Sequence, residues 1–160
     1  MNTNHTILQI DDPSQKSQIA KAILYQLPDW FGIPESTNEY IDGCADKPLW
    51  AAMVEGSPVG FIALKETSPV TAEIYVMGVL PHLHHSGIGR SLFLALECYA
   101  EKQGCQFIQV KTVRKGSWES YDKTNEFYVA MGFSEFECFP EYWDEKNPCQ
   151  IYVKAVPSDK

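Results

Sequence analysis

The chain has 160 residues, of which 44 % are hydrophobic and 21 % charged, a balance typical of one globular domain and unlike a disordered chain. Its 13 Lys and Arg residues and 21 Asp and Glu residues give a formal net charge of 13 − 21 = −8, which disfavours binding to nucleic acid. No long apolar run and no signal-peptide pattern occurs, so no membrane partner is predicted. We expect a cytoplasmic protein with a single domain spanning residues 1–160.

Hydrophobic periodicity predicts seven strands and four helices along the chain. The predicted strands cover residues 6–10, 49–54, 59–64, 73–80, 107–113, 133–139 and 150–156. The predicted helices cover residues 14–27, 35–43, 87–102 and 121–131. A hairpin turn at residues 55–58 joins two of the strands, and one strand-helix-strand crossover follows later in the chain. This order indicates an α+β fold, in which helices flank a mixed sheet.

The cysteines and histidines give no sign of a disulfide framework or of a metal site. The sequence holds five cysteines, an odd number, and no C-x-x-C pair, so we expect reduced thiols. His82, His84 and His85 share one loop, but they lack the i, i+4 spacing of helical metal ligands and have no adjacent carboxylate. We therefore predict that the protein binds no metal.

The segment from Val79 to Arg90, VLPHLHHSGIGR, carries the strongest functional signal. A strand stops at Pro81, a polar loop follows, and Gly87 and Gly89 open an amphipathic helix. The first N–H groups of a helix have no intrahelical acceptor, and together with the helix dipole they attract anions. Arg90 strengthens the signal, because a cation in the first turn opposes the dipole unless an anion binds there. These residues predict a phosphate-binding loop.

This segment resembles the acetyl-CoA motif of the GNAT superfamily of N-acetyltransferases, Arg/Gln-x-x-Gly-x-Gly/Ala. His84, Gly87 and Gly89 stand at its defined positions, although Arg or Gln is usual in place of His84. The resemblance implies acetyl-CoA as co-substrate and a mostly antiparallel sheet with about four helices. It also implies that backbone N–H groups bind the diphosphate and that the end of the preceding strand binds the pantetheine arm. The predicted cofactor-binding residues are Val79, Leu80, His84, His85, Ser86, Gly87, Ile88, Gly89, Arg90 and Tyr128.

A second segment, Tyr121 to Phe133, is similar to the C-terminal GNAT signature, a helix that carries Phe-Tyr-x-x-x-Gly-Phe. Tyr128 stands at the family's position for the general acid that protonates the leaving thiolate. A phenol pKa of about 10 and a thiol pKa of about 8.5 keep this proton transfer close to balanced. Considered without the resemblance, Phe127 and Tyr128 would equally suit ordinary core aromatics.

Glu73 is the candidate general base. It begins the segment EIYVMGVL, where strand alternation places Glu73, Tyr75, Met77 and Val79 on one face. Its spacing to Val79 equals that of the catalytic glutamate in the histone-acetylating branch of the family. By the same resemblance, the Val79 amide polarises the acetyl carbonyl. A solvated glutamate at the end of a strand would give the same pattern, and many family members have no single base.

The acceptor side in the family draws on the first two helices and the last strands. Trp30, Phe31, Glu35 and Tyr121 are the candidate acceptor-binding residues. Further aromatic and acidic residues lie in the same regions: Glu39, Tyr40, Trp118, Glu119, Tyr142 and Trp143. Rings and carboxylates suit a cationic amine through charge and cation–π contact, although each residue alone would equally cover a small core. We expect a small-molecule amine, whose identity the sequence does not give.

The leading interpretation is therefore an enzyme that moves an acetyl group from acetyl-CoA to a primary amine. No cysteine is adjacent in sequence to the loop histidines, which favours direct attack in a ternary complex over an acyl-cysteine. An alternative is a non-catalytic acyl-CoA-binding sensor or scaffold, which would need neither Tyr128 nor Glu73. The P-loop pattern and the third glycine of a dinucleotide fingerprint are absent, which argues against other phosphate ligands. Association into a homodimer is left open.

Overall fold

The structure, a computed structural model, describes residues 4–157. Its strands are β1 (Thr6–Ile10), β2 (Leu49–Val54), β3 (Ser57–Ser68), β4 (Thr71–Val79), β5 (Phe107–Val113), β6 (Ser134–Asp144) and β7 (Asn147–Ala155). Its helices are α1 (Pro13–Leu24), α2 (Pro34–Gly43), α3 (Ile88–Lys102) and α4 (Glu119–Ala130), with short 3-10 turns η1 (Cys44–Asp46) and η2 (Pro81–Leu83). The order of these elements along the chain is the predicted one.

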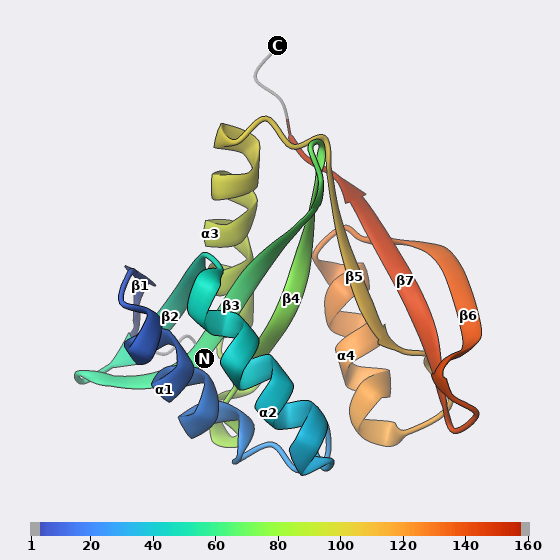
Figure 1. Cartoon of the computed structure of the whole chain (residues 1–160), viewed down its shortest axis with the longest axis horizontal. Coiled ribbons are helices and arrows are strands. Elements are labelled where there is room, and N and C mark those ends of the chain that lie inside the picture. Colours follow the sequence, from blue (N-terminus) through green and yellow to red (C-terminus); the bar gives the residue numbers. More distant parts are fainter. Residues whose placement is uncertain (1–3, 158–160) are drawn as a thin grey trace. The chain divides into compact units, whose positions relative to one another are not determined.

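Hydrogen bonds between neighbouring strands give the order β1-β2-β3-β4-β5-β7-β6 (Figure 1). The pairs β1–β2, β2–β3, β5–β7 and β6–β7 are antiparallel, whereas β4 and β5 are parallel. The prediction of an α+β fold with a mixed, mostly antiparallel sheet is therefore confirmed. By their contacts, the residues form two compact units, which are described separately: unit 1 (Met1–Lys65 and Tyr75–Tyr99) and unit 2 (Glu66–Ile74 and Ala100–Lys160).

The predicted boundaries were wrong mainly where strands continue past their apolar residues. β3 runs to Ser68, β6 runs to Asp144, and β7 already begins at Asn147. The residues that extend β3 past Leu64, Lys65 to Ser68, are all polar, and backbone pairing can extend a ladder without apolar side chains. Helix α1 was predicted too long at its C-terminal end, because Leu27 is buried although the helix ends at Leu24.

The core of unit 1 forms where α1 packs on the sheet. Helix α1 begins after Asp12, whose Oδ2 accepts a hydrogen bond from the Gln15 N–H at 2.8 Å, a helix N-cap. A Cβ added at Gly78 of β4 would lie 2.8 Å from Leu27 Cδ1 and 3.1 Å from Ile23 Cγ2. Glycine at this position therefore leaves room for Ile23 of α1 and for Leu27, which follows α1, to pack against β4. Packing therefore explains why a glycine occurs inside this strand.

A second close approach in unit 1 joins β4 to the end of α2. A Cβ at Gly43 would overlap the Tyr75 hydroxyl and would lie 2.9 Å from Tyr75 Cζ. The Tyr75 hydroxyl donates a hydrogen bond to the Glu39 carbonyl at 3.5 Å, and Lys47 Nζ lies 4.2 Å from the centroid of the Tyr75 ring. Burial, with a smaller contribution from the Cys44 thiol, raises the pKa of Tyr75 to about 12. The phenol therefore stays protonated and can keep donating.

In unit 2, helix α4 lies along β5, and polar groups tie the helix to two strands (Figure 1). Asn125 of α4 is 1 % exposed, and its Nδ2 donates hydrogen bonds to the carbonyls of Val113 at 2.8 Å and Tyr121 at 2.6 Å. The Tyr152 hydroxyl of β7 donates to Asn125 Oδ1 at 2.6 Å. Because these buried polar groups are paired, they fix α4 against the sheet without an unsatisfied group.

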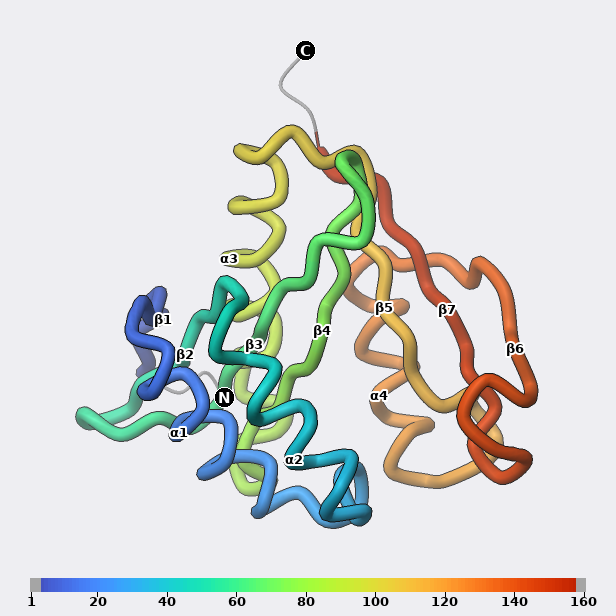
Figure 2. The backbone as a smooth tube through the Cα atoms, in the orientation of Figure 1, coloured from blue at the N-terminus to red at the C-terminus, as the bar shows by residue number. Residues whose placement is uncertain are grey.

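Strand β6 lies at one end of the strand order and is exposed along most of its length. Its pairing with β7 is interrupted between Phe139 and Asp144, where the backbone leaves the ladder and curls before the hairpin turn (Figure 2). Pro140 lies in this interruption and has no N–H to donate to a ladder. Among residues 4–157, no helix combines the length and the apolar character needed to cross a membrane.

Candidate active site

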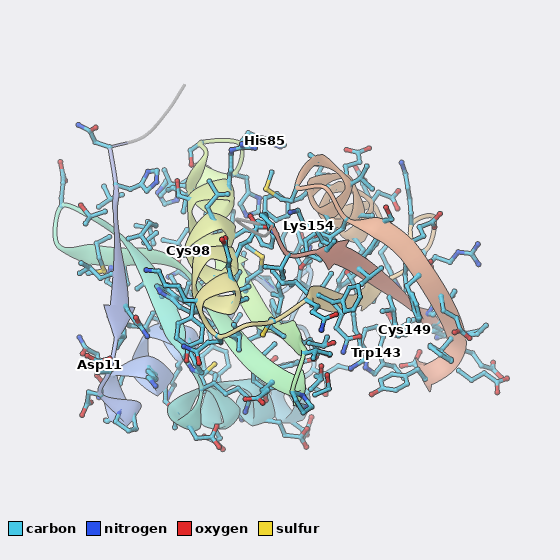
Figure 3. All side chains as sticks on the ribbon, turned by 90° about the horizontal axis from the view of Figure 1, so that it is seen from above. Asp11, His85, Cys98, Trp143, Cys149 and Lys154 are labelled. Atoms are coloured by element: carbon cyan, nitrogen blue, oxygen red, sulfur yellow. The ribbon has the colours of Figure 1, made fainter. Side chains whose placement is uncertain are left out.

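The loop between β4 and α3 lies in unit 1 and contains two residues with left-handed backbone before the helix begins. His85 has φ of 64° and Gly87 has φ of 88°, values that glycine adopts without strain and other residues rarely adopt. Figure 3 shows His85 at the end of α3 at which the helix starts. Glycine at position 87 is therefore required by the backbone conformation of the loop as well as by its expected closeness to a ligand.

Helix α3 presents a set of backbone donors at its first turn. The Ser91 N–H and the Ser91 hydroxyl both donate to the Gly87 carbonyl at 3.1 Å, which marks the start of the helix. The N–H groups of Ile88, Gly89 and Arg90 precede this first intrahelical bond, so they have no acceptor within the helix. Three neighbouring donors at the positive end of a helix dipole favour an anion with several oxygens. The exposed Arg90 adds a cation at the same turn.

Several side chains of the loop are held by the loop itself. His84 Nε2 lies 2.7 Å from the Val79 carbonyl oxygen, and since a carbonyl only accepts, Nε2 carries a proton. The hydroxyl of the buried Ser86 donates to the Leu83 carbonyl. The Leu80 N–H donates to the Val59 carbonyl at 2.9 Å. These contacts hold the loop in place without a ligand. An anion at this site would therefore be bound mainly by the N–H groups at the start of α3.

Trp30, a candidate acceptor residue, contacts this loop. Its ring meets the His84 ring edge-on, with centroids 5.6 Å apart. Phe31 packs against Tyr40, and Tyr40 packs against Tyr75, with centroid distances of 6.1 and 5.3 Å. The structure thus brings Trp30 to the predicted cofactor loop and places Phe31 in a row of partly buried rings within unit 1.

Glu35 and Tyr121, the other two candidate acceptor residues, lie in different surroundings. Glu35 is exposed in the first turn of α2, where a carboxylate stabilises the helix dipole. Tyr121, in unit 2, uses its carbonyl to accept the hydrogen bond from Asn125, and its side chain is partly buried. The structure therefore gives both residues a local structural role, and their part in acceptor binding stays a prediction.

Glu73, the predicted general base, lies in unit 2 and is 6 % exposed. Its Oε1 accepts hydrogen bonds from Lys111 Nζ at 2.7 Å and from Gln109 Nε2 at 3.1 Å. Register explains these partners, because Glu73 pairs with Gln109 in the parallel ladder of β4 and β5, and Lys111 lies two residues further on the same face. The alternative of a solvated glutamate at a strand end is therefore wrong for Glu73.

Lys111 remains charged in this position. Burial lowers the pKa of Lys111, but the hydrogen bond and the charge of Glu73 raise it, and the net shift is upward. Lys111 Nζ also lies 5.9 Å from the centroid of the Tyr142 ring. The result is a buried ion pair with an aromatic ring beside the ammonium group.

Tyr128, the predicted general acid, lies in α4 and is 5 % exposed. Its ring packs against Phe127, Phe133 and Tyr152, with centroid distances of 5.5, 5.7 and 6.1 Å. Phe133 follows the helix, and the Phe133 N–H donates to the Tyr128 carbonyl at 3.0 Å. The motif residues Phe127, Tyr128 and Phe133 thus form one aromatic cluster that holds the Tyr128 ring in place.

Gln109 and Lys111 are the site residues that the sequence did not identify. The signal was present, because these two polar residues alternate with apolar ones in the strand FIQVKTV and therefore share a face. Their partner could not be found without the register between β4 and β5. Within residues 4–157, no group of three His, Cys, Asp or Glu side chains is arranged to hold a metal ion.

Comparison with known proteins places the chain in a family. Residues 15–133 match the family model described as Acetyltransferase (GNAT) family, so the chain belongs to the GNAT acetyltransferases and is an N-acetyltransferase. Comparison with the curated proteins found no match.

Solved structures share the fold at low sequence identity. A GNAT-family protein from Desulfovibrio desulfuricans superposes with a TM-score of 0.80 at 19 % identity, covering 96 % of this chain and 100 % of that one. An aminoglycoside 6'-N-acetyltransferase complexed with coenzyme A gives 0.77 at 18 % identity, covering 97 % and 99 %. The ribosomal-protein-S18-alanine N-acetyltransferase of Escherichia coli gives 0.77 at 16 % identity, covering 98 % and 97 %. At these identities the likeness concerns the fold.

Proposed function

We propose that the protein transfers an acetyl group from acetyl-CoA to the primary amine of a small acceptor, by direct attack within a ternary complex. The observation that carries this proposal is the loop before α3, where left-handed backbone at His85 and Gly87 leads into the N–H groups of Ile88, Gly89 and Arg90, which have no acceptor within the helix. Such a cradle suits a diphosphate. The aminoglycoside acetyltransferase of the same fold was solved with coenzyme A, which supports the same co-substrate here.

In the proposed reaction the chain moves two protons. Glu73 takes a proton from the acceptor ammonium, and the resulting neutral amine nitrogen attacks the thioester carbonyl carbon. The nitrogen then loses its second proton to water, and the carbon–sulfur bond breaks. Tyr128 gives its proton to the departing thiolate, and the Val79 N–H stabilises the charge that develops on the carbonyl oxygen. The amide and free coenzyme A result, and both side chains exchange protons with water before the next cycle.

The cysteines support direct attack. Burial raises the pKa of Cys44 to about 12 and that of Cys149 to about 11, and it also raises the pKa of Cys105. A nucleophilic cysteine needs the opposite shift, since the thiolate is the reactive form. These three thiols therefore do not favour an acyl-cysteine intermediate.

The acceptor is proposed to be a cationic small amine, bound with help from Trp30, Phe31, Glu35 and Tyr121. The net charge of −8 attracts such a substrate, and it disfavours nucleic acid as a partner. The relatives named above act on an aminoglycoside and on a ribosomal-protein alanine, so both small and protein amines belong in the test. We further propose that the protein acts in the cytoplasm, as one domain and without a metal.

The deciding experiment is a thiol-release assay with acetyl-CoA and a panel of amines: kanamycin, spermidine, phenethylamine, free amino acids and a peptide with an N-terminal alanine. We expect release that depends on the amine, together with an increase in melting temperature on addition of acetyl-CoA. Millimolar acetyl-CoA that neither raises the melting temperature nor gives a calorimetric signal would contradict the proposal.

A further inference from the structure

The ion pair of Glu73 is asymmetric. Both of its hydrogen-bond donors, Lys111 Nζ and Gln109 Nε2, bind the same oxygen, Oε1. Within residues 4–157, no hydrogen bond is made to Oε2. A carboxylate that is 6 % exposed and held by one oxygen keeps its second oxygen available to a group that enters later.

Gln109 fixes the geometry of this arrangement without adding charge. Its Nε2 donates to Glu73 Oε1 at 3.1 Å and to Thr67 Oγ1 at 3.2 Å, so both amide hydrogens are used. Thr67 Oγ1 in turn donates to the Thr71 carbonyl at 3.3 Å. The amide of Gln109 is therefore held between β3 and the carboxylate, and it restricts rotation of the Glu73 side chain.

Lys111 contributes both geometry and charge. Its ammonium lies 2.7 Å from Glu73 Oε1, and its own side chain is 24 % exposed. An isolated carboxylate in this position would be strongly disfavoured in its ionised form, because burial penalises charge. A cation at this distance stabilises the carboxylate, which is the form of Glu73 that can accept a proton.

We infer that Lys111 and Gln109 are positioning residues for acetyl transfer, which hold Glu73 by Oε1 and leave Oε2 to receive the proton of the acceptor amine. This inference rests on the proposed function, in which Glu73 is the base. The amine loses one proton, Glu73 gains it at Oε2, and Lys111 keeps its own proton throughout. Protonation of Glu73 therefore changes the pair from neutral to a net charge of +1, and the ammonium then favours release of this proton to water.

The two residues act differently, which makes them separable. Removing Lys111 removes a charge, so the pKa of Glu73 should rise. Removing Gln109 leaves the ion pair intact, so the Glu73 carboxylate should become less firmly oriented while its titration changes little. The other titratable groups around this pair within unit 2 are Cys149, Tyr142 and Cys138, and burial raises the pKa of the Cys149 thiol to about 11.

The first measurement needs no acceptor. The Glu73 carboxyl is titrated by ¹³C NMR in the wild type, Lys111→Met, Lys111→Arg and Gln109→Leu, with the signal assigned by its loss in Glu73→Gln. We expect the Glu73 signal to titrate at a higher pH in Lys111→Met than in the wild type, to return close to wild type in Lys111→Arg, and to change little in Gln109→Leu. An unchanged Glu73 titration in Lys111→Met would overturn the role of Lys111.

The second measurement follows kcat/KM against pH with the best amine of the panel. In Lys111→Met the acidic limb of the kcat/KM–pH profile should move to higher pH by the same amount as the Glu73 titration measured by NMR. Gln109→Leu should lower kcat about 10-fold with an unchanged limb and an unchanged KM for acetyl-CoA. Gln150→Leu is a matched control, because the buried Gln150 amide donates to the carbonyls of Glu137 and Ile151 and makes no contact with Glu73. Equal kcat in Gln109→Leu and wild type would overturn the role of Gln109.

Loss of folding and loss of the proposed function are both distinguishable from failure of this inference. If Lys111→Met does not fold, the double variant Lys111→Met/Glu73→Gln, which has no buried charge at the pair, should fold, and Gln109→Leu then decides the inference. If the wild type releases no thiol with any amine, the proposed function fails. The positioning roles fail separately, when the wild type is active and both variants match it.

Discussion

The loop before α3 and the cluster around Glu73 are two regions built in opposite ways. The loop uses backbone groups of consecutive residues, Ile88, Gly89 and Arg90, whose direction is set by the helix that follows. The cluster uses side chains that lie 36 and 38 residues from Glu73 in the chain. A binding site made of backbone tolerates changes of side chain except where glycine is needed, whereas a site made of side chains depends on strand register. The three predictions below compare the two units in which these regions lie.

The largest effect is expected from Tyr128→Phe in unit 2. The substitution removes one hydroxyl and keeps the ring, which Phe127, Phe133 and Tyr152 hold. If the hydroxyl protonates the leaving thiolate, kcat should fall by roughly 10²–10⁴, the usual range for a general acid. Calorimetry should give nearly the wild-type Kd for acetyl-CoA. Turnover close to wild type would assign the rate enhancement to positioning and to carbonyl polarisation instead.

A smaller effect is expected from charge at the loop, where Gly89→Glu is compared with Gly89→Gln. Position 89 belongs to α3, so both side chains are compatible with the helical backbone. Glu in the first turn favours the helix dipole and should not lower the melting temperature, yet it repels a bound diphosphate. We expect the Kd for acetyl-CoA to be about 10-fold higher in Gly89→Glu than in Gly89→Gln. Equal Kd values in the two variants would show that the phosphates bind elsewhere.

The smallest effect appears only at alkaline pH and compares one buried thiol in each unit. Cys44 and Cys149 are both 0 % exposed, and burial raises their pKa from 9.0 to about 12 and about 11. The folded state therefore keeps protons that the unfolded chain releases, so this contribution to stability is complete below pH 9 and declines as the pH rises above it. Ionisation of each thiol in the unfolded chain should lower the free energy of unfolding by roughly 1 kcal/mol between pH 8 and pH 10.

Denaturant unfolding at the two pH values checks this expectation. Cys44→Ala and Cys149→Ala should each show a smaller decline in the free energy of unfolding than the wild type, and Cys98→Ala, at an exposed position on α3, serves as the control (Figure 3). The same experiment tests the expectation of a single domain, because the tryptophans of both units should then report one transition. If the free energy of unfolding of a Cys→Ala variant declines as steeply with pH as that of the wild type, the thiol removed in that variant ionises freely in the folded protein.

The contrast between the two regions also explains what the sequence could predict. The boundaries of the loop were predicted to within one residue, because a strand end, two glycines and a helix start are local signals that need no knowledge of distant pairing. Glu73 was predicted only as a candidate, and its partners Gln109 and Lys111 were missed, since the parallel register of β4 with β5 is a long-range property.

The strand ends show the same limit. The extension of β6 to Asp144 rests on the pairing of Asp144 with Asn147 of β7 beyond the interruption after Phe139, and no local sequence pattern indicates it. The burial of Asn125 of α4 could not be predicted either, because an asparagine in a helix is usually exposed. Its hydrogen bonds to the Val113 carbonyl and the Tyr152 hydroxyl depend on strands that lie elsewhere in the chain. Conversely, the helix that carries Tyr128 was predicted to within two residues at its start, since its periodicity is local.

The contact between Gly43 and Tyr75 has a consequence for the order in which substitutions can accumulate. The phenol oxygen of Tyr75 occupies the volume that any side chain at position 43 would need, so position 43 cannot change first. A smaller residue at position 75 opens that volume, and position 43 then becomes free to vary. In a library that randomises both codons, non-glycine residues at position 43 should survive only in clones that have also lost the tyrosine, so the two sites behave as one unit of variation.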